Sequence, residues 1–333
     1  MWSDLITTVR HVRAVIFPLD KQWQLDGRGY SQALSYQVVW LSGLVSFAEV
    51  EQILAEVGQM AIGKTCIWEQ TQVHGERLAQ KMRTQQQTVS VERTRWVHQK
   101  YDPFLTRCVS MDGGMVCILG EGWKELKVGL VSAVEADWQA SKPTVRLKEM
   151  VYRAAIGDVK TFEPVLWALA VQYDVPYAGR LVIVADGAQW IWRLVADLFP
   201  VCTQIVDYYH AKQHLAQAAH SIYANDEPAA DTLLKRMSDW LFQGEIWKII
   251  AALQQHQQSA SYFLHHQRRM QYPQFRADGF PIGSGGIESA IKQFKHRLTG
   301  AGMRWSRQGA ERMITIRSAI LSGTLPDLWL QAA

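Results

Sequence analysis

Leu181–His210 reads LVIVADGAQWIWRLVADLFPVCTQIVDYYH and is the stretch that decides the fold. It opens with five consecutive apolar residues, Leu181–Ala185, which are too few for a core helix and typical of a strand buried on both faces. A helix is expected over Trp190–Phe199 and a second strand over Thr203–Tyr208. Strands that alternate with helices in this way predict parallel strands in an α/β sheet.

The residues upstream have the pattern of antiparallel strands. Arg107–Leu119 and Lys124–Asp137 are strand-like runs joined at Gly120–Gly122, which is a hairpin signal, and Val145–Ala155 is a candidate third strand. A helix is expected after each of the last three strands, and Thr161 is the expected cap of the first of these helices. The order β-β-β-α-β-α-β-α predicts a ribonuclease H-like α/β core.

The N-terminal part has a helical period. From Ser31 the apolar residues fall on one face of a helix, Ser46 can cap a second helix, and Thr65 begins a polar and basic third helix. Two helices joined by a short turn with glycine, the second of them basic, are typical of a helix-turn-helix that binds the DNA major groove. An ordinary helical hairpin is the alternative. The first two helices are expected to bury the stripes Leu34, Val38, Leu41, Val45 and Phe47, Val50, Leu54, Val57.

Composition excludes several classes of protein. The chain has 333 residues, 48% of them apolar, and no run of the roughly 18 apolar residues that span a bilayer. Met1–Lys21 lacks the layout of a secretory signal, so we expect a soluble cytoplasmic protein. The four cysteines form no CxxC pair, which supports neither a zinc site nor a disulfide framework. Cys108 and Cys117 are expected to be small buried hydrophobic residues.

Positive charge is concentrated in two stretches, although the net charge is only +4. Arg77–Arg107 and Lys292–Arg317 each contain seven Lys or Arg residues, with a tryptophan inside each stretch. Basic stretches are most often solvated faces. Two of them with interleaved tryptophans favour a nucleic-acid partner.

Three acidic residues form the candidate site. Asp112 lies in the first predicted strand, Asp186 ends the buried strand, and Glu288 opens a helix beside the apolar stripe of Ile287, Ile291, Phe294 and Leu298. In a ribonuclease H-like order the two aspartates lie on neighbouring strands about 4.8 Å apart, where they can share a Mg²⁺ ion. A plain turn at each aspartate and a surface pair between Glu288 and Lys292 are the alternatives.

Other residues near these acids are candidates for accessory roles. Asp207 and His210 could orient substrate or take protons, or they could be a helix cap and a solvent-facing histidine. Gly113–Gly114 and Gly187 follow the two aspartates, and a missing side chain there would let a phosphate backbone approach closely.

Five motifs in order resemble one family over almost the whole chain, from about Phe17 to Trp329. The motifs SMDGGMV, GWKELKVGLV, VIVADGAQWIW, IVDYYHAKQHL and IESAIKQFKHRLTGAGMRWS are similar to those of bacterial insertion-sequence transposases of the ISKra group, among the Mutator-like DDE transposases. The resemblance implies that Asp112, Asp186 and Glu288 are the catalytic acids and hold two Mg²⁺ (or Mn²⁺) ions. It also implies that Asp207 and His210 form the D-x-x-H element.

The resemblance also implies a division into regions. These are an N-terminal tail (1–30), a helical DNA-binding region with linker (31–100), the first part of the core (101–224), an all-helical insertion (225–282) and a basic C-terminal region carrying the third acid (283–333). Such transposases usually begin with a Cys-rich, zinc-ribbon-like segment before the position of Phe17–Asp20. No CxxC lies there. The chain is therefore expected to be the downstream part of a longer reading frame or a truncated copy.

The expected activity is cleavage and strand transfer of double-stranded DNA, at transposon ends and at a target, by a homo-oligomer associated with the nucleoid and not with a membrane. Two other hypotheses stay open: an inert or truncated remnant that acts only as a sequence-specific DNA-binding protein, and a structure-selective nuclease. The residues expected to contact DNA are Lys64, Arg77, Lys81, Arg83, Lys292, Lys295, Arg297, Arg304 and Arg307.

Overall fold

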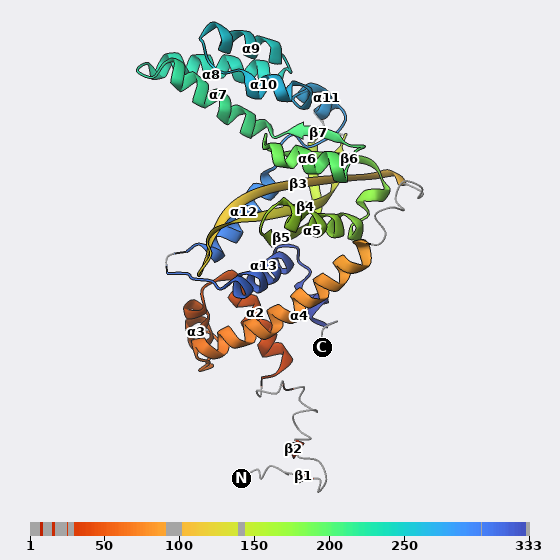
Figure 1. Cartoon of the computed structure of the whole chain (residues 1–333), viewed down its shortest axis with the longest axis vertical. Helices are drawn as coiled ribbons and strands as arrows, with labels where there is room; N and C mark the ends of the chain where they lie inside the picture. The colour runs from red at the N-terminus through yellow and green to blue at the C-terminus, as the bar shows by residue number, and fades with distance from the viewer. Residues whose placement is uncertain are drawn as a thin grey trace.

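The centre of the molecule is a mixed five-stranded sheet in the order β5-β4-β3-β6-β7 (Figure 1). Strands β3, β4 and β5 are antiparallel, whereas β6 pairs parallel with β3 and β7 parallel with β6. The α/β class and mixed sheet expected from the sequence are confirmed, and the strand order is compatible with the predicted core. The strands are β3 (Asp102–Ile118), β4 (Gly122–Asp137), β5 (Thr144–Ile156), β6 (Ala178–Ala185) and β7 (Thr203–Val206).

This computed structural model describes residues 30–90, 102–138, 144–300 and 302–330, with residues 7–8, 15–16 and 25 before them. Two short strands, β1 (Thr7–Thr8) and β2 (Val15–Ile16), pair antiparallel. No described helix combines the length and the apolar character needed to cross a membrane.

The β3–β4 hairpin forms where two glycines permit its turn. Gly120 and Gly122 have φ angles of 76° and 73°, in the left-handed region that favours glycine. Strand β3 then alternates between buried and exposed positions near its end, so Val116 and Ile118 are buried while Cys117 is exposed. The expectation that Cys108 is buried is confirmed, and the same expectation for Cys117 is wrong because its side chain lies on the opposite face of the strand.

Helices cover both faces of the sheet. Helix α5 (Val159–Gln172) packs on β4 and β5 from one side, and α12 (Gly285–Leu298) and α13 (Arg307–Leu321) pack from the other. Residues 181–185 are all buried, as predicted. The cap of α5 is Asp158, whose carboxylate accepts hydrogen bonds from both the N–H and the hydroxyl of Thr161. The prediction of Thr161 as the cap is therefore wrong.

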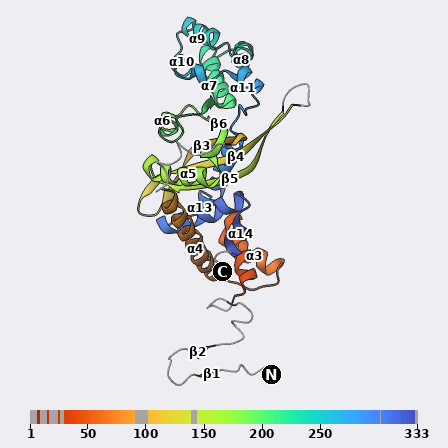
Figure 2. The same ribbon diagram turned by 90° about the vertical axis from the view of Figure 1, so that its right-hand side faces the viewer.

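Residues 208–277 form a helical end of the molecule (Figures 1 and 2). Its apolar side chains belong to the same core cluster as the sheet, so the two parts are packed together. The six-residue α11 was not predicted, because Pro273 and the short length hide its helical period. These helices are α7 (Tyr208–Ile222), α8 (Glu227–Phe242), α9 (Ile246–Gln255), α10 (Ser261–His266), η3 (Gln267–Arg269) and α11 (Tyr272–Ala277), and α6 (Gln189–Leu198) lies between β6 and β7.

The N-terminal helices form the opposite end. They are α2 (Gln32–Leu44), α3 (Phe47–Glu56) and α4 (Lys64–Ser90). Helices α2 and α4 pack against α13 near α14 (Leu325–Leu330), and α3 packs on α2 and α4. Ser46 caps α3 as predicted and forms a capping box with Glu49. Val57 is 82% exposed, which contradicts its assignment to the buried stripe.

Two buried arginines attach these N-terminal helices to the C-terminal part. The Nε of Arg297 on α12 donates to the carbonyl of Ser42 (2.6 Å), and Nη1 of Arg317 on α13 donates to the carbonyl of Gly43 (3.0 Å). Both carbonyls belong to the last turn of α2, whose carbonyls lack partners within the helix. The basic C-terminal stretch therefore has a structural role at these two positions.

Candidate active site

Asp112 and Asp186 follow the parallel pairing of β3 with β6. The last pair of this register is Val109 with Ile183, and each aspartate comes three residues after its member of that pair. Adjacent strands are about 4.8 Å apart, and matched side chains of parallel strands point to the same face. Strand β6 ends at Ala185, so both carboxylates lie where that strand ends.

Glu288 approaches the two aspartates from the helix that covers this face of the sheet. It lies in the first turn of α12, whose stripe of Ile287, Ile291, Phe294 and Leu298 is buried as predicted. One cavity of about 190 Å³ is lined by Asp112, Asp186 and Glu288. Its other lining residues are Met111, His210, Gln213, Ser284 and Ile287. The three acids that the sequence selected thus face one cavity from three separate elements.

The surroundings of Asp112 disfavour its negative charge. Burial raises the pKa of Asp112, and the charges of Asp186 and Glu288 raise it further, while the N–H of Gly113 and the charge of Lys295 act in the opposite direction. Oδ1 of Asp112 accepts from Gly113 N–H (2.6 Å), and Oδ1 of Asp186 accepts from Ala188 N–H (2.9 Å). The N–H of Glu288 donates to the carbonyl of Ser284 (3.2 Å), and within the described residues its carboxylate makes no hydrogen bond or ion pair.

The lining set has the chemistry that a hard divalent cation requires. Its three carboxylates are oxygen donors and no cysteine lies among them, which fits Mg²⁺ or Mn²⁺ better than a soft metal. A cation would also relieve the mutual repulsion that helps to raise the pKa of Asp112. As the side chains stand, however, no three Asp, Glu, His or Cys residues of the described chain are grouped closely enough to hold a metal ion. The acids share a cavity without converging on one point.

Asp207 links two walls of this cavity. Its side chain is 1% exposed and caps α7, where Oδ1 accepts from His210 N–H (2.8 Å). Its Oδ2 accepts from the N–H of Ser284, the residue just before α12. The helix-cap alternative is therefore confirmed. The same carboxylate also ties α7 to the loop that leads to Glu288.

His210 lines the acid cavity, so it is not simply a solvent-facing residue. Its ring centroid lies 5.2 Å from that of His214, which stacks on Tyr262 at 3.9 Å. Burial lowers the pKa of His214, and the neighbouring His210 lowers it further. A row of rings from α7 and α10 therefore lies beside Asp186.

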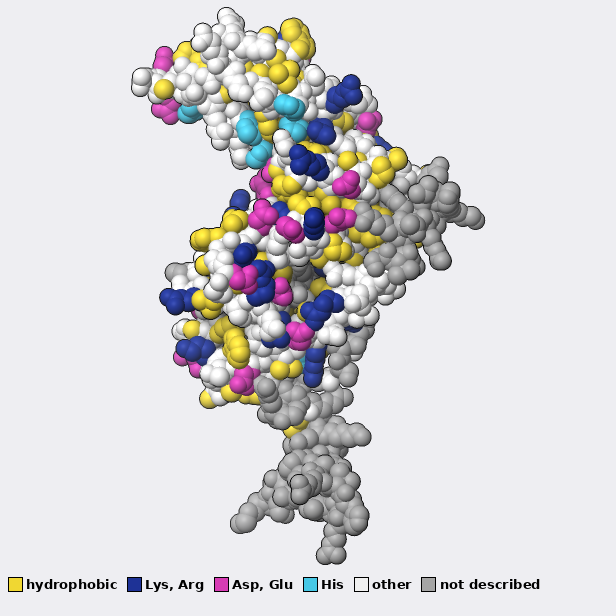
Figure 3. Space-filling view, viewed as in Figure 1, with side chains coloured by type: hydrophobic (Ala, Val, Ile, Leu, Met, Phe, Trp, Pro, Cys, Tyr) yellow, Lys and Arg dark blue, Asp and Glu magenta, His cyan; other side chains and the backbone are white. Residues whose placement is uncertain are grey.

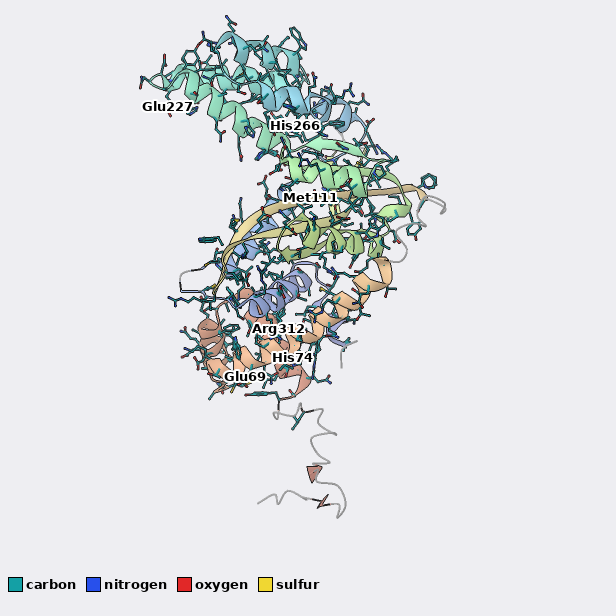
Figure 4. All side chains as sticks on the ribbon, viewed as in Figure 1. Glu69, His74, Met111, Glu227, His266 and Arg312 are labelled. Carbon is teal, nitrogen blue, oxygen red and sulfur yellow. The ribbon has the colours of Figure 1, made fainter. Side chains whose placement is uncertain are left out.

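Helix α10 supplies residues that the sequence did not indicate. A Cβ at Gly187 would lie 2.3 Å from Cε2 of Tyr262, and the Gly187 carbonyl accepts a hydrogen bond from His266. Figure 4 labels His266 and Met111, which lie on the two sides of the junction between the helical end and the sheet. The sequence predicts a helix over Ala260–Arg269, and α10 and η3 confirm it. No local pattern places its side chains beside Asp186, and the only signal was the glycine after Asp186.

The glycines beside the two aspartates make room for protein side chains. Gly187 accommodates Tyr262, and at Gly114 a Cβ would lie 2.7 Å from Cε of Lys295. The expected close approach of a phosphate backbone is therefore not available at Gly187 in this structure, and at Gly114 it requires the end of the Lys295 side chain to move. The closest atoms to a Cβ at Gly113 are 3.7 Å away, which is ordinary contact.

The residues expected to contact DNA differ in accessibility. Arg297 is 1% exposed, lies between the rings of Phe47 and Trp305, and has a pKa lowered to about 10, mainly by burial and also by Arg317. We therefore remove Arg297 from this set. Lys81 and Arg307 are half-buried, and Arg307 pairs with Glu121. The exposed members are Lys64, Arg77, Arg83, Lys292, Lys295 and Arg304.

No protein-family model and no curated protein matches this chain.

Proposed function

We propose that the protein is a DDE-type DNA transposase of the insertion-sequence kind, with a ribonuclease H-like catalytic core. One observation carries the proposal: three carboxylates, from β3, from just after β6 and from α12, line a single cavity. Asp112, Asp186 and Glu288 would hold two Mg²⁺ (or Mn²⁺) ions there.

When bound, such ions activate the attacking oxygen and stabilise the leaving oxygen of a phosphodiester. The protein's own groups would position the reactants. His210 faces the cavity and can accept a proton from the attacking water. Lys295 lies close enough to lower the pKa of Asp112, and it can pair with a phosphate. Water first cleaves a strand and frees a 3′-hydroxyl, which then attacks a phosphodiester of the target DNA and displaces a new 3′-hydroxyl.

Binding of double-stranded DNA is assigned to the exposed cations of α4 and of the C-terminal region. Lys64, Arg77 and Arg83 lie on α4, and Lys292 and Lys295 lie on α12 beside the acids. Binding through several phosphates releases counterions, so the affinity should fall steeply between about 50 and 200 mM salt. A flat affinity over this range would contradict the role of these residues. We expect a homo-oligomer on DNA, associated with the nucleoid.

The test is cleavage by variants that remove one carboxylate each. Asp112→Asn, Asp186→Asn and Glu288→Gln keep the size of the side chain and should each abolish nicking of a plasmid carrying the DNA that flanks the locus. Asp197→Asn, at an exposed position on α6 outside the cavity, is the matched control and should cleave normally. A variant of the trio that nicks at the unsubstituted rate would remove its acid from the site.

The second candidate is a catalytically inert DNA-binding protein. It is favoured by the absence, among the described residues, of three metal-binding side chains converging on one point. Titration with Mn²⁺ separates the two candidates: binding that the Asp186→Asn variant loses supports the enzyme, whereas no binding together with no cleavage supports the inert protein. A structure-selective nuclease would cleave without joining strands.

A further inference from the structure

A second, larger hollow lies beside the loop that follows Asp186. A pocket of about 640 Å³ between α6 and α10 is lined by residues that include Gly187, Arg193, Tyr262 and His265. A pocket of about 650 Å³ along η3 shares His265 and Arg269 with it and adds Arg268. We call the two pockets together the α6–α10 groove. Figure 3 shows histidine, lysine and arginine side chains gathered where the helical end joins the rest of the molecule.

The groove is positively charged. Three arginines line it, Arg193, Arg268 and Arg269, and no Asp or Glu is among the lining residues of either pocket. Arg193 and Arg268 are exposed. Arg193 donates a long hydrogen bond to Oε1 of Gln189 (3.5 Å), and neither arginine pairs with a carboxylate of a described residue. Arg269 is held by Gln204, to which its Nε donates (2.8 Å). An acid-free hollow with unpaired guanidinium groups is suited to an anionic ligand, because guanidinium groups bind phosphates in bidentate geometry.

The wall of the groove also contains hydrogen-bond donors without acceptors. Nε1 of Trp192 and the hydroxyl of Tyr262 are buried and have no partner in the described part of the chain. Both atoms are fully covered by protein, so they belong to the packing of the groove wall and offer no contact to a ligand on its surface.

We infer that the α6–α10 groove binds a single strand of nucleic acid next to the phosphodiester that enters the acid cavity, an inference that rests on the proposed function. Gly187 lines the groove and follows Asp186, which lines the acid cavity, so the two hollows are neighbours. Each pocket has the volume of a small-ligand site, roughly 300–1,000 Å³. A duplex, whose major groove alone is about 12 Å wide, does not enter such a hollow.

The test compares two pairs of charge removals in an Asp112→Asn background without divalent ions, so that no cleavage occurs. Arg193→Gln with Arg268→Gln alters the groove. Lys235→Gln with Arg236→Gln removes the same charge from α8, where neither residue lines the groove. Binding of a labelled strand of about 12 nucleotides, and of the matching duplex, is followed by fluorescence anisotropy from about 50 to 200 mM salt.

The double variant Arg193→Gln with Arg268→Gln should weaken single-strand binding about tenfold. It should also reduce the slope of log K against log salt by about 1.4, the value for two phosphate contacts on a single strand. The control variant Lys235→Gln with Arg236→Gln should change the affinity for the single strand less than about twofold. The affinity for the duplex should change little in both double variants, because the duplex contacts α4 and α12. Equal effects of the two pairs, or an equal loss for single strand and duplex, would overturn the inference.

Cleavage assays with the acids intact and Mg²⁺ present separate this inference from the proposed function. Single-strand binding that depends on the groove, in a protein that never cleaves, would support the groove and refute the transposase. Normal cleavage with groove variants that bind single strands like the control would refute the groove alone.

Discussion

Replacing Asp207 with asparagine tests whether one buried carboxylate holds the two walls of the acid cavity together. Its Oδ1 accepts from His210 N–H at the start of α7, and its Oδ2 accepts from Ser284 N–H before α12. Asparagine has one carbonyl oxygen and one NH₂ group, so it can keep only one of these bonds. Whichever bond is kept, the NH₂ group then faces a backbone N–H of the protein.

The expected loss follows from these two contacts. A hydrogen bond to a charged group contributes roughly 1.5–3 kcal/mol, and a buried donor without an acceptor costs roughly 1–3 kcal/mol. Removing a charge from a site that is 1% exposed offsets part of this loss, because the buried carboxylate had to be dehydrated. We expect Asp207→Asn to lower the free energy of unfolding by about 2 kcal/mol.

The assay is urea unfolding followed by tryptophan fluorescence, with Asp158→Asn as the matched control. Asp158 caps α5 through Oδ1 alone, is exposed, and can be replaced by asparagine, which caps helices about as well. The control should therefore unfold almost like the original protein. Equal midpoints for the two variants would refute the argument that Asp207 is a tie between α7 and the loop before α12.

Three other predictions follow from single contacts. Arg297→Met should lower the free energy of unfolding by about 2–4 kcal/mol in urea, because a carbonyl of α2 loses its buried donor; an unchanged midpoint would contradict this. Gly187→Ala should cost about 1–3 kcal/mol and reduce cleavage, because the new Cβ lies 2.3 Å from the Tyr262 ring, whereas Gly285→Ala, with nothing within 4 Å of the added Cβ, should be tolerated. The pKa of His266 is lowered to about 4, chiefly by burial and also by a nearby arginine. The unfolded chain therefore takes up this proton from about pH 6.5 downward while the folded protein does so only near pH 4, and stability should fall by about 2 kcal/mol between these values. A His266→Gln variant should lose this part of the pH dependence, and an identical pH profile would be evidence against it.

Local pattern predicted much of the sheet and its covering helices. The apolar run at 181–185 is a fully buried strand, and the stripe of α12 is buried at every predicted position. The hairpin glycines and the Ser46 cap are also where they were expected. Each of these features depends on neighbours within a few residues, so the sequence contains the information directly. The errors at Thr161 and Val57 are boundary errors, where one better acceptor or the end of a helix decides the outcome.

The sequence by itself determined which acids are candidates and which faces of the elements are apolar, because side-chain period and end signals are properties of short segments. Only the tertiary structure decided that Asp112 and Asp186 line one cavity, that Arg297 is buried under α2, and that Tyr262 occupies the space at Gly187. The strand offset and the packing of distant helices are set by how whole surfaces fit together. The residues next to a position in the sequence do not specify which distant residue will pack against it.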